Sequence, residues 1–267
     1  MTKPLKLIAA NDTFGALLAF TDVLDGKLAV FITPPEVNGK MPETFGLPDE
    51  VADDVALIVE SSGSTGTPKR IEISREALLN SANASALALG SIQASSQWLL
   101  ALPINFIAGA NVLIRSVIAG NQPVMMNTSV PFTAEAFARS AYLMTGSRRY
   151  TSLVPTQLSR LASAIDDPFS PTGTNDFLLA QLRKFDAILV GGQAPQDEVI
   201  ERLRDLGIKI VITYGMTETC GGCVYDGIAL DGVSIDLVGN RIQISGKVLA
   251  DEVADESGAQ PIGDSFL

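Results

Sequence analysis

The sequence predicts an α/β domain of largely parallel sheets covered by helices, with a small antiparallel β subregion near the C-terminus. Apolar residues make up 46% of the 267 positions, which is enough for a sizeable core. Short β-rich runs alternate with helical patterns from residue 55 onward, as in βαβ units. After residue 223, short alternating segments are separated by Asp-Gly pairs typical of hairpin turns. We expect residues 1–222 to form an α/β core and residues 223–267 to form a β-rich subregion of the same domain.

Strands are expected where β-branched and other apolar residues form short runs between turn signals. The expected strands are Val55–Val59, Ile71–Ile73, Trp98–Ala101, Val124–Met126, Thr151–Val154, Ala187–Val190 and Ile208–Thr213. The first 50 residues contain several turn signals, including Thr33-Pro34-Pro35 and Val37-Asn38-Gly39.

Helices are expected between these strands, because capping residues and prolines lie at suitable positions. One helix is expected to begin after a cap at Ser74 and to end at Leu89, before Gly90. A second is expected to begin after a cap at Thr133 and to end near Met144. Two more are expected to have Pro155 and Pro195 in their first turns. Residues 166–174 contain proline and glycine and predict an exposed loop.

The charge balance excludes several classes of function. Nineteen basic and 30 acidic residues give a net charge of −11, which disfavours nucleic acid and anionic membranes as partners. With no histidine, the chain cannot use histidine-based metal sites or a Ser-His-Asp triad. It contains neither a signal peptide pattern nor an uncharged apolar run long enough to span a bilayer. We expect a cytoplasmic protein with a small-molecule ligand.

The segment Ser61–Lys69, which reads SSGSTGTPK, is the strongest local feature. It combines five hydroxyls, two glycines and a lysine in nine residues. Glycine backbone N–H groups approach an anion closely, hydroxyls donate to phosphate oxygens, and lysine neutralises charge. Pro68 before the lysine excludes a Walker loop. The alternative is a flexible Ser/Gly turn.

This segment resembles the phosphate loop of the adenylate-forming superfamily, which includes the acyl-CoA ligases. A second match, Thr213–Thr219 (TYGMTET), is similar to the superfamily's Y-G-x-T-E motif. The resemblance implies that Tyr214 stacks on adenine, Thr217 contacts the α-phosphate and Glu218 helps to hold Mg²⁺. Alone, a Thr-Glu pair at a strand end is more often a helix cap.

Further segments follow the superfamily's order along the chain. They are Leu102-Pro103 to Gly109, the glycine turn Gly191-Gly192-Gln193-Ala194, and Gly263-Asp264. Residues 152–161 (SLVPTQLSRL) closely resemble the o-succinylbenzoate-CoA ligases of menaquinone biosynthesis, and residues 217–227 resemble their actinobacterial branch. The resemblance spans about residues 55–264 and implies the adenylate-forming fold of a large N-terminal domain.

Arg115 is the only charged residue in the apolar helical pattern of residues 106–119. A lone cation there must find an anion or reach water. o-Succinylbenzoate carries two carboxylates, of which the aliphatic one is activated, so Arg115 is a candidate to hold the aromatic one. A snorkelling or structurally paired arginine remains the alternative, and Arg148 and Arg149 compete for the anion.

The resemblance implies ATP-dependent formation of an acyl-adenylate, followed by displacement of AMP by coenzyme A. ATP and Mg²⁺ are the implied cofactors, and Glu218 is the implied metal ligand. The implied catalytic residues are Thr65, Lys69, Thr217 and Glu218. The implied nucleotide-binding residues are Ser62, Gly63, Ser64, Thr65, Gly66, Thr67, Lys69, Gly191, Gly192, Gln193, Tyr214, Gly215, Thr217 and Asp264. The expected acyl-binding residues are Asn105, Phe106, Gly109, Arg115, Ser152, Thr156, Gly192 and Met216.

The sequence departs from the family at two places. Asn105-Phe106 stands where relatives usually have histidine, so any gating at that point is steric. Relatives continue past the ribose aspartate into a small C-terminal domain, whereas three residues follow Asp264 here. We therefore expect the large N-terminal domain alone, with reduced activity or none, and a homodimer is a possible assembly. The alternatives are a ligase for another aryl or short acyl acid and a noncatalytic nucleotide-binding module.

Two cysteines, Cys220 and Cys223, are too few for a disulfide-rich scaffold or a metal site without histidine. We expect reduced thiols packed near the nucleotide turn, with redox sensitivity as the alternative.

Overall fold

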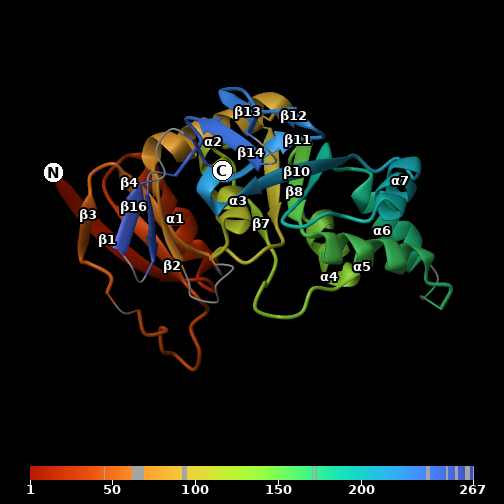
Figure 1. The fold of residues 1–267 in the computed structure, drawn as a ribbon. Helices are drawn as coiled ribbons and strands as arrows, with labels where there is room; N and C mark the ends of the chain where they lie inside the picture. The colour runs from red at the N-terminus through yellow and green to blue at the C-terminus, as the bar shows by residue number, and fades with distance from the viewer. Residues whose placement is uncertain are drawn as a thin grey trace.

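The computed structural model confirms an α/β fold built from three sheets and the helices between and around them (Figure 1). It describes residues 1–44, 46–61, 69–91, 95–169, 171, 173–238, 241–250, 252–255, 258–261 and 265–266. None of the helices in these ranges is long and apolar enough to cross a membrane.

The first sheet has the strand order β16-β15-β5-β4-β2-β1-β3. Its strands are β1 (Thr2–Ala9), β2 (Ala29–Thr33), β3 (Glu50–Ala52), β4 (Val55–Ser61), β5 (Lys69–Ser74), β15 (Glu252–Asp255) and β16 (Gly258–Pro261). Only the pairs β1–β2 and β2–β4 are parallel, and the remaining neighbours are antiparallel.

The antiparallel pairing of β4 with β5 differs from the βαβ unit expected from residue 55 onward. Ser61 pairs with Lys69, so the chain reverses between these two residues. A parallel connection needs a crossover of a dozen or more residues, which this segment is too short to provide. Both ends of the hydroxyl-rich segment therefore lie side by side at one end of the hairpin.

The second sheet has the strand order β12-β11-β10-β9-β8-β6-β7. Its strands are β6 (Ser96–Leu100), β7 (Val124–Met125), β8 (Arg148–Leu153), β9 (Ala187–Val190), β10 (Ile210–Met216), β11 (Gly221–Tyr225) and β12 (Ile228–Ala229). The strands from β7 to β10 are parallel, as the sequence predicts, and β11 and β12 add an antiparallel edge. β10 begins two residues later than expected and continues to Met216.

The third sheet is antiparallel, but it contains only part of the expected subregion of residues 223–267, since β12 joins the second sheet and β15 and β16 join the first. It consists of β13 (Val233–Val238), β14 (Arg241–Gly246) and β17 (Ser265–Phe266), with β14 in the centre. The boundary between core and subregion was expected at residue 223. This residue lies within β11, which belongs to the second sheet.

The helices form two groups, one between the first and second sheets and one on the far face of the second sheet. They are α1 (Thr13–Leu24), α2 (Arg75–Leu89), α3 (Ile107–Ala119), α4 (Ala134–Tyr142), α5 (Pro155–Asp166), α6 (Thr174–Leu182) and α7 (Asp197–Asp205), with a 3₁₀ turn η1 (Thr217–Thr219). Helices α1 to α3 contribute to one large core with strands of both sheets, and α4 to α7 contribute to a second core on the far face (Figure 1). α3 thus lies at the centre of the molecule.

Local capping chemistry explains several helix ends. The Ser74 Oγ accepts a hydrogen bond from the Ala77 N–H at 3.2 Å, and Thr133 caps α4 in the same way. Pro155 occupies the first turn of α5 as expected. Pro195 lies one residue before the N-cap of α7, so its expected place in the first turn was wrong. Asp197 and Glu198 form the acidic start of that helix instead.

The N-terminal region contains more regular structure than its turn signals indicate. The expected turn at Asn38-Gly39 is present, with φ of 53° and 75°, and it lies in the connection between β2 and β3. The strands β1 and β2 and the helix α1 were not expected. β2 is buried throughout its length, which removes the alternation that identifies a half-exposed strand.

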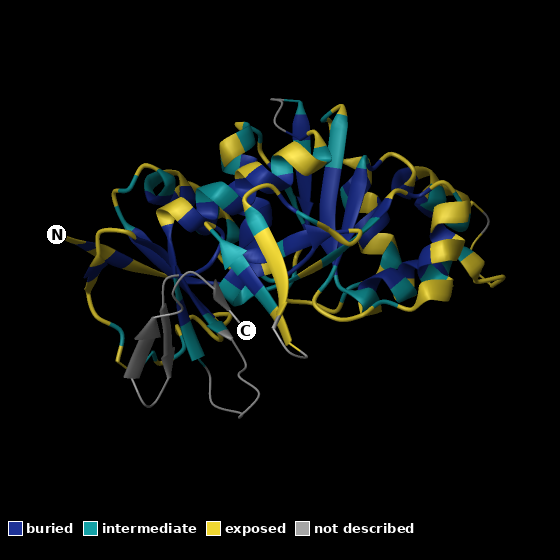
Figure 2. Ribbon diagram, turned by 45° about the horizontal axis from the view of Figure 1, so that its top comes forward, coloured by how far each residue is buried: buried dark blue, intermediate teal, exposed yellow. Residues whose placement is uncertain are grey.

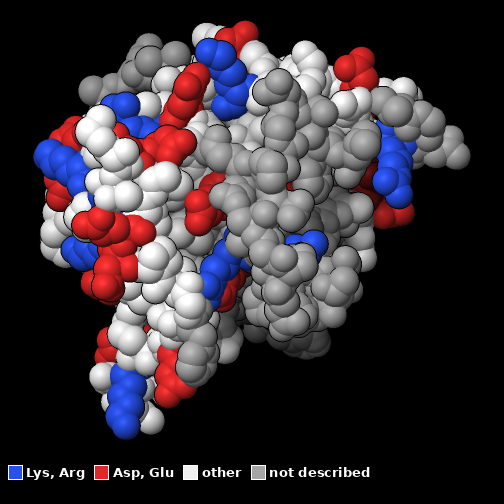
Figure 3. Space-filling model, turned by 60° about the vertical axis from the view of Figure 1, so that its left-hand side comes forward, with Lys and Arg blue, Asp and Glu red and all other residues white. Residues whose placement is uncertain are grey.

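Charges of both signs are mixed on the molecular surface. On the face shown in Figure 3, acidic and basic side chains lie beside one another. Lys27 in the turn after α1 has its Nζ 3.0 Å from Asp22 and 2.8 Å from Asp25. The hydrogen bond and charge of Lys27 lower the pKa of Asp25. Such exposed pairs contribute little to stability.

Lys3 on β1 is an exception, because this residue is only 4% exposed. In Figure 2 buried stretches run through the strands of the sheets, and charged residues are rare among them. The Lys3 Nζ has no hydrogen-bond partner among the described residues. Burial lowers the pKa of Lys3 below 10.5, while the charges of Asp53 and Asp54 oppose that effect and Arg75 adds to it. The buried ammonium therefore costs stability at neutral pH.

We predict that Lys3→Met raises the free energy of unfolding at pH 7 by about 1–3 kcal/mol, because it removes an unsatisfied buried donor. In the wild type, at pH values between the lowered pKa of Lys3 and 10.5, the unfolded chain binds more protons at Lys3 than the folded chain does. Its stability should therefore rise with pH in that window. Urea unfolding from pH 7 to 10.5 measures both effects. The exposed Lys6→Met on the same strand is the control, and an unchanged alkaline slope in Lys3→Met would contradict the prediction.

Candidate active site

A cavity of about 420 Å³ lies where the C-terminal ends of β8, β9 and β10 meet α3 and η1. Ligands of α/β sheets bind at this edge of the strands. Nine expected residues line it: Phe106, Arg115, Ser152, Gly191, Gly192, Gly215, Met216, Thr217 and Glu218. The structure thus brings together residues from four separate sequence segments.

Other residues that line the same cavity were not expected from the sequence. The polar ones among them are Glu60, Asn111, Thr213 and Tyr225. Asn111 had a recognisable signal, since it is an amide in an otherwise apolar helix, one turn before Arg115. Glu60 directly precedes the hydroxyl-rich segment. Tyr225 lies in the segment 217–227, which resembles the family, but the resemblance implied no role for this residue.

The glycines at the strand ends allow main chains to approach closely. A Cβ on Gly191 would lie 2.2 Å from the Thr213 Oγ1, and one on Gly215 would lie 2.0 Å from the main-chain oxygen of Gly221. Both distances are shorter than any packed contact. Larger residues at these positions would separate β9, β10 and β11 and close the cavity edge.

The turn η1 is held by polar contacts that place Thr217 and Glu218 at the cavity. The Thr219 Oγ1 lies 2.9 Å from the Met216 N–H, which donates to it. The main-chain oxygen of Cys220 accepts hydrogen bonds from the Asn111 Nδ2 at 2.8 Å and from the Ser81 Oγ at 3.2 Å. The turn is therefore anchored to both α3 and α2.

The two cysteines at this turn are buried and unbridged, as expected. Burial raises the pKa of the Cys223 thiol. A buried thiol with a raised pKa is a poor nucleophile, so the Cys223 side chain acts as a packing group.

Arg115 on α3 is 7% exposed and borders the cavity. Its Nη2 donates to the Tyr225 hydroxyl at 3.3 Å, and its guanidinium carbon lies 5.1 Å from the centre of the Trp98 ring. Its Nε is buried and has no hydrogen-bond partner among the described residues. In the part of the chain that the structure describes, no carboxylate forms an ion pair with it. A buried cation in this state favours an anionic ligand.

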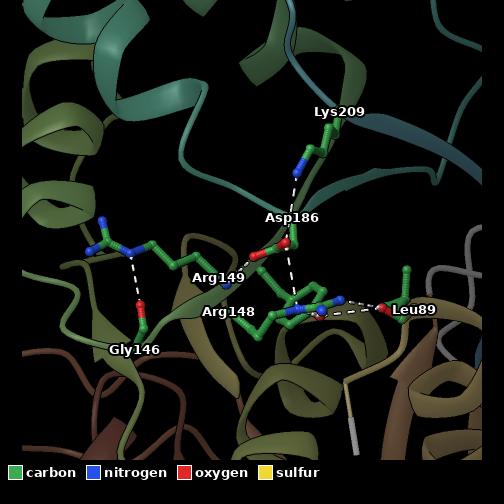
Figure 4. A network of polar contacts seen from close by, with 7 residues as sticks. Leu89, Gly146, Arg148, Arg149, Asp186 and Lys209 are labelled. Atoms are coloured by element: carbon green, nitrogen blue, oxygen red, sulfur yellow. Dashed lines mark hydrogen bonds and ion pairs between the residues drawn. The ribbon is translucent and has the colours of Figure 1, made fainter. Parts of the chain in front are cut away.

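Arg148 and Arg149, the competing candidates, lie at the N-terminal end of β8, at the opposite edge of the sheet (Figure 4). The Asp186 carboxylate lies 3.5 Å from the Arg148 Nε and accepts a hydrogen bond from the Arg149 main chain. The Arg149 Nε donates to the Gly146 oxygen at 3.0 Å. The contact with Tyr150 and the charge of Asp186 raise the pKa of Arg148. Both arginines therefore stabilise the sheet edge and do not border the cavity.

Several expected residues lie outside the cavity lining. Thr156 and Gln193 are exposed, Asn105 is half-buried, and Lys69 begins β5 beside Ser61. Tyr214 is 46% exposed and lies on β10 between the lining residues Thr213 and Gly215. The expected residues Ser62, Gly63, Ser64, Thr65, Gly66, Thr67 and Asp264 lie outside the described residues.

Gly109 does not border the cavity and has a packing role, while its expected contact with the acyl group stays a prediction. A Cβ at this position would lie 2.2 Å from the main-chain oxygen of Pro103. The glycine therefore lets α3 pack against the Leu102-Pro103 segment. Within the motif of residues 152–161, Gln157 is also structural, because its Nε2 donates to the Ala101 oxygen at 2.9 Å.

Two carboxylates border the cavity, and only one is available for a cation. Glu60 pairs with the Arg70 Nε at 3.2 Å. The Glu218 side chain forms no ion pair with the described residues, and its main-chain oxygen accepts from the Ala250 N–H at 2.7 Å. The described residues contain no group of three potential metal ligands. Mg²⁺ is commonly held by one or two carboxylates together with substrate phosphates, so Glu218 fits that role with a bound nucleotide.

The fold and this cavity define a domain of the adenylate-forming class. The chain belongs to the family of AMP-binding enzymes, whose pattern matches residues 13–263. It is 39% identical over 249 residues to the "Probable 2-succinylbenzoate–CoA ligase" of Mycobacterium tuberculosis, covering 93% of this chain and 61% of that protein. It is 32% identical over 218 residues to the 2-succinylbenzoate–CoA ligase of Geobacillus kaustophilus, covering 78% and 40%. The chain thus spans less than two thirds of these relatives.

Solved structures support the fold. The o-succinylbenzoate CoA synthetase of Bacillus subtilis in complex with the acyl-adenylate intermediate OSB-AMP superposes with a TM-score of 0.68 at 19% identity, covering 98% of this chain and 65% of that one. A malonyl-CoA ligase with methylmalonyl-CoA and AMP bound gives a TM-score of 0.71 at 21% identity, covering 98% and 68%. The large-domain fold expected from the sequence is therefore confirmed.

We predict that Gly109→Ala lowers the free energy of unfolding by about 1–3 kcal/mol through overpacking against Pro103. This loss should occur even though alanine favours helix by about 1 kcal/mol. Urea denaturation measures it. Gly120→Ala, whose Cβ meets nothing within 4 Å, should cost about 1–2 kcal/mol from its left-handed backbone alone. Full stability of Gly109→Ala combined with weaker ligand binding would restore a binding role.

Proposed function

We propose that this chain binds ATP and o-succinylbenzoate and holds them for formation of the acyl-adenylate, the first half of a ligation to coenzyme A. In that reaction the aliphatic carboxylate attacks the α-phosphorus, and pyrophosphate leaves. The coenzyme A thiol then displaces AMP. The observation that carries the proposal is the buried Arg115, which forms no ion pair with the described residues and borders the same cavity as Thr217 and Glu218.

The site suits this chemistry because the nucleophile needs no base. A carboxylate is already ionised at pH 7, so the reaction mainly requires positioning and neutralisation of charge. Thr217 supplies a hydroxyl donor for the α-phosphate at the cavity, and Glu218 supplies a carboxylate oxygen for a cation. A bound Mg²⁺ supplies neutralisation of the phosphate oxygens. A chain without histidine can therefore perform the reaction.

The remaining nucleotide contacts in the proposal come from the family resemblance. Lys69, at the start of β5, and the segment 62–67 hold the β- and γ-phosphates, and Tyr214 stacks on adenine. Tyr214 is half exposed beside the cavity, which leaves its ring face open to a base. Asp264 is assigned to the ribose hydroxyls. ATP and coenzyme A are cytoplasmic metabolites, so the proposal includes a cytoplasmic location.

The acyl part of the site favours an aromatic dicarboxylate. Phe106 is 54% exposed and borders the cavity, so its ring offers an apolar surface. Arg115 lies deeper and is covered by Trp98 and Tyr225. An acid with a second carboxylate supplies the missing anion, whereas a monocarboxylate leaves Arg115 unpaired. The similarity to 2-succinylbenzoate–CoA ligases supports the same substrate.

Acid-dependent exchange of pyrophosphate into ATP tests the function. We expect exchange that depends on o-succinylbenzoate, measured on the chain and on a form extended to the length of its relatives. Nucleotide binding without exchange in both forms would indicate a noncatalytic binding module. Exchange with another acid alone would indicate a different ligase.

We predict that Lys69→Ala and Tyr214→Ala each weaken ATP binding by about 10-fold or more. The first loses a charge-assisted hydrogen bond of about 1.5–3 kcal/mol, and the second loses base stacking of about 1–3 kcal/mol. Calorimetry with ATP and Mg²⁺ measures the affinity. Lys27→Ala and Tyr142→Ala, both on the exposed surface, are matched controls. Unchanged affinity in both site variants would overturn the nucleotide assignment.

We predict that Arg115→Leu erases the preference for an acid with a second carboxylate. Its loss should cost about 1–3 kcal/mol in binding of the o-succinylbenzoyl ligand. The comparison uses nonhydrolysable adenylate analogues of o-succinylbenzoate and of 4-oxo-4-phenylbutanoate, which lacks only the ring carboxylate. Arg148→Leu, outside the cavity, should keep the preference. If Arg115→Leu also keeps it, Arg115 is a structural residue.

A further inference from the structure

We infer that Tyr225 is a specificity-determining residue, which orients Arg115 and donates a second hydrogen bond to the carboxylate that Arg115 binds. This inference rests on the proposed function and adds a residue to its acyl subsite. Tyr225 is the last residue of β11, is 6% exposed and borders the cavity.

Three elements meet at the Tyr225 hydroxyl. Arg115 on α3 donates to it from Nη2 at 3.3 Å, and the Ser85 Oγ on α2 lies 2.8 Å away. Ser85 is fully buried, so its hydroxyl has no access to water. The hydroxyl of Tyr225 is therefore held at a defined point beside the guanidinium.

The donor and acceptor sites of the Tyr225 hydroxyl limit which hydrogen bonds it can form. A tyrosine hydroxyl has one donor and two acceptor sites, and arginine is a donor only. Tyr225 must therefore accept from Arg115. Its contact with Ser85 can run in either direction. When Ser85 donates, the Tyr225 proton is free to point toward an anion in the cavity, and no covalent bond changes.

The same contacts restrict Arg115 itself. Trp98 covers the guanidinium at 5.1 Å, and Tyr225 fixes Nη2. The Nε stays without a partner in the described structure. These contacts at one face and one corner fix the plane of the guanidinium, and a fixed plane suits a planar carboxylate. Removing the Tyr225 hydroxyl frees one corner and removes one donor from the subsite.

The test is Tyr225→Phe, which keeps the ring and removes the hydroxyl. Calorimetry uses the two adenylate analogues described above, with and without the ring carboxylate. We expect about 10-fold weaker binding of the carboxylate-bearing analogue, which corresponds to about 1.4 kcal/mol. The other analogue should bind within about twofold of the wild type, since it makes no use of the hydroxyl.

Tyr150→Phe is the matched control. Tyr150 is also fully buried and its hydroxyl also contacts an arginine, Arg148, at 3.2 Å, but it does not border the cavity. We expect Tyr150→Phe to lower stability and to leave the ratio of the two affinities unchanged. Ser85→Ala, a smaller change, should shift the ratio in the same direction as Tyr225→Phe.

The outcomes separate this inference from the function on which it rests. The double variant Arg115→Leu with Tyr225→Phe should lose no more preference than Arg115→Leu alone, because the two residues act together. If Arg115→Leu erases the preference and Tyr225→Phe keeps it, the inference fails and the proposed function stands. If neither analogue binds the wild type, or Arg115→Leu keeps the preference, the proposed substrate fails and the inference falls with it.

Discussion

The hydrogen bond from the Asn111 side chain to the main-chain oxygen of Cys220 joins the central helix α3 to the turn η1. Cys220 has a φ of 53°, a conformation that is unusual for a residue other than glycine. Ser81 on α2 donates to the same oxygen, so two helices fix this one point. The cavity depends on this junction, because Arg115 lies one turn further along α3 and Thr217 and Glu218 lie on the turn itself.

The arginines of this chain show how place in the fold decides chemical role. Arg148 lies at the N-terminal edge of the second sheet, where Asp186 neutralises it. Arg115 is enclosed by Trp98 and Tyr225, and the described residues provide it with no carboxylate. An unpaired buried cation is costly for an isolated domain. It becomes favourable once a ligand supplies the anion, so stability and substrate preference are linked through this side chain.

Features that depend on neighbouring residues were predictable from the sequence. The caps at Ser74 and Thr133 are local hydrogen bonds, and the parallel strands of the second sheet follow from apolar runs between helices. Features that depend on distant partners were not. The antiparallel β4–β5 pair required attention to loop length, and β1, β2 and α1 were hidden among turn signals. The close approach of Gly109 to the Pro103 main chain was likewise not visible in the motif to which this glycine belongs.

The family was evident from the hydroxyl-rich segment and the Tyr214–Glu218 motif, and the apolar pattern around Arg115 marked it as a candidate to bind an anion. The folded chain adds that Arg115 meets no carboxylate among the described residues and that it donates to the Tyr225 hydroxyl. The physical reason is distance along the chain. Arg115 and Tyr225 are 110 residues apart, and Ser85 and Tyr225 are 140 apart. Contacts over such separations are made by packing between sheets and helices, which no local pattern encodes.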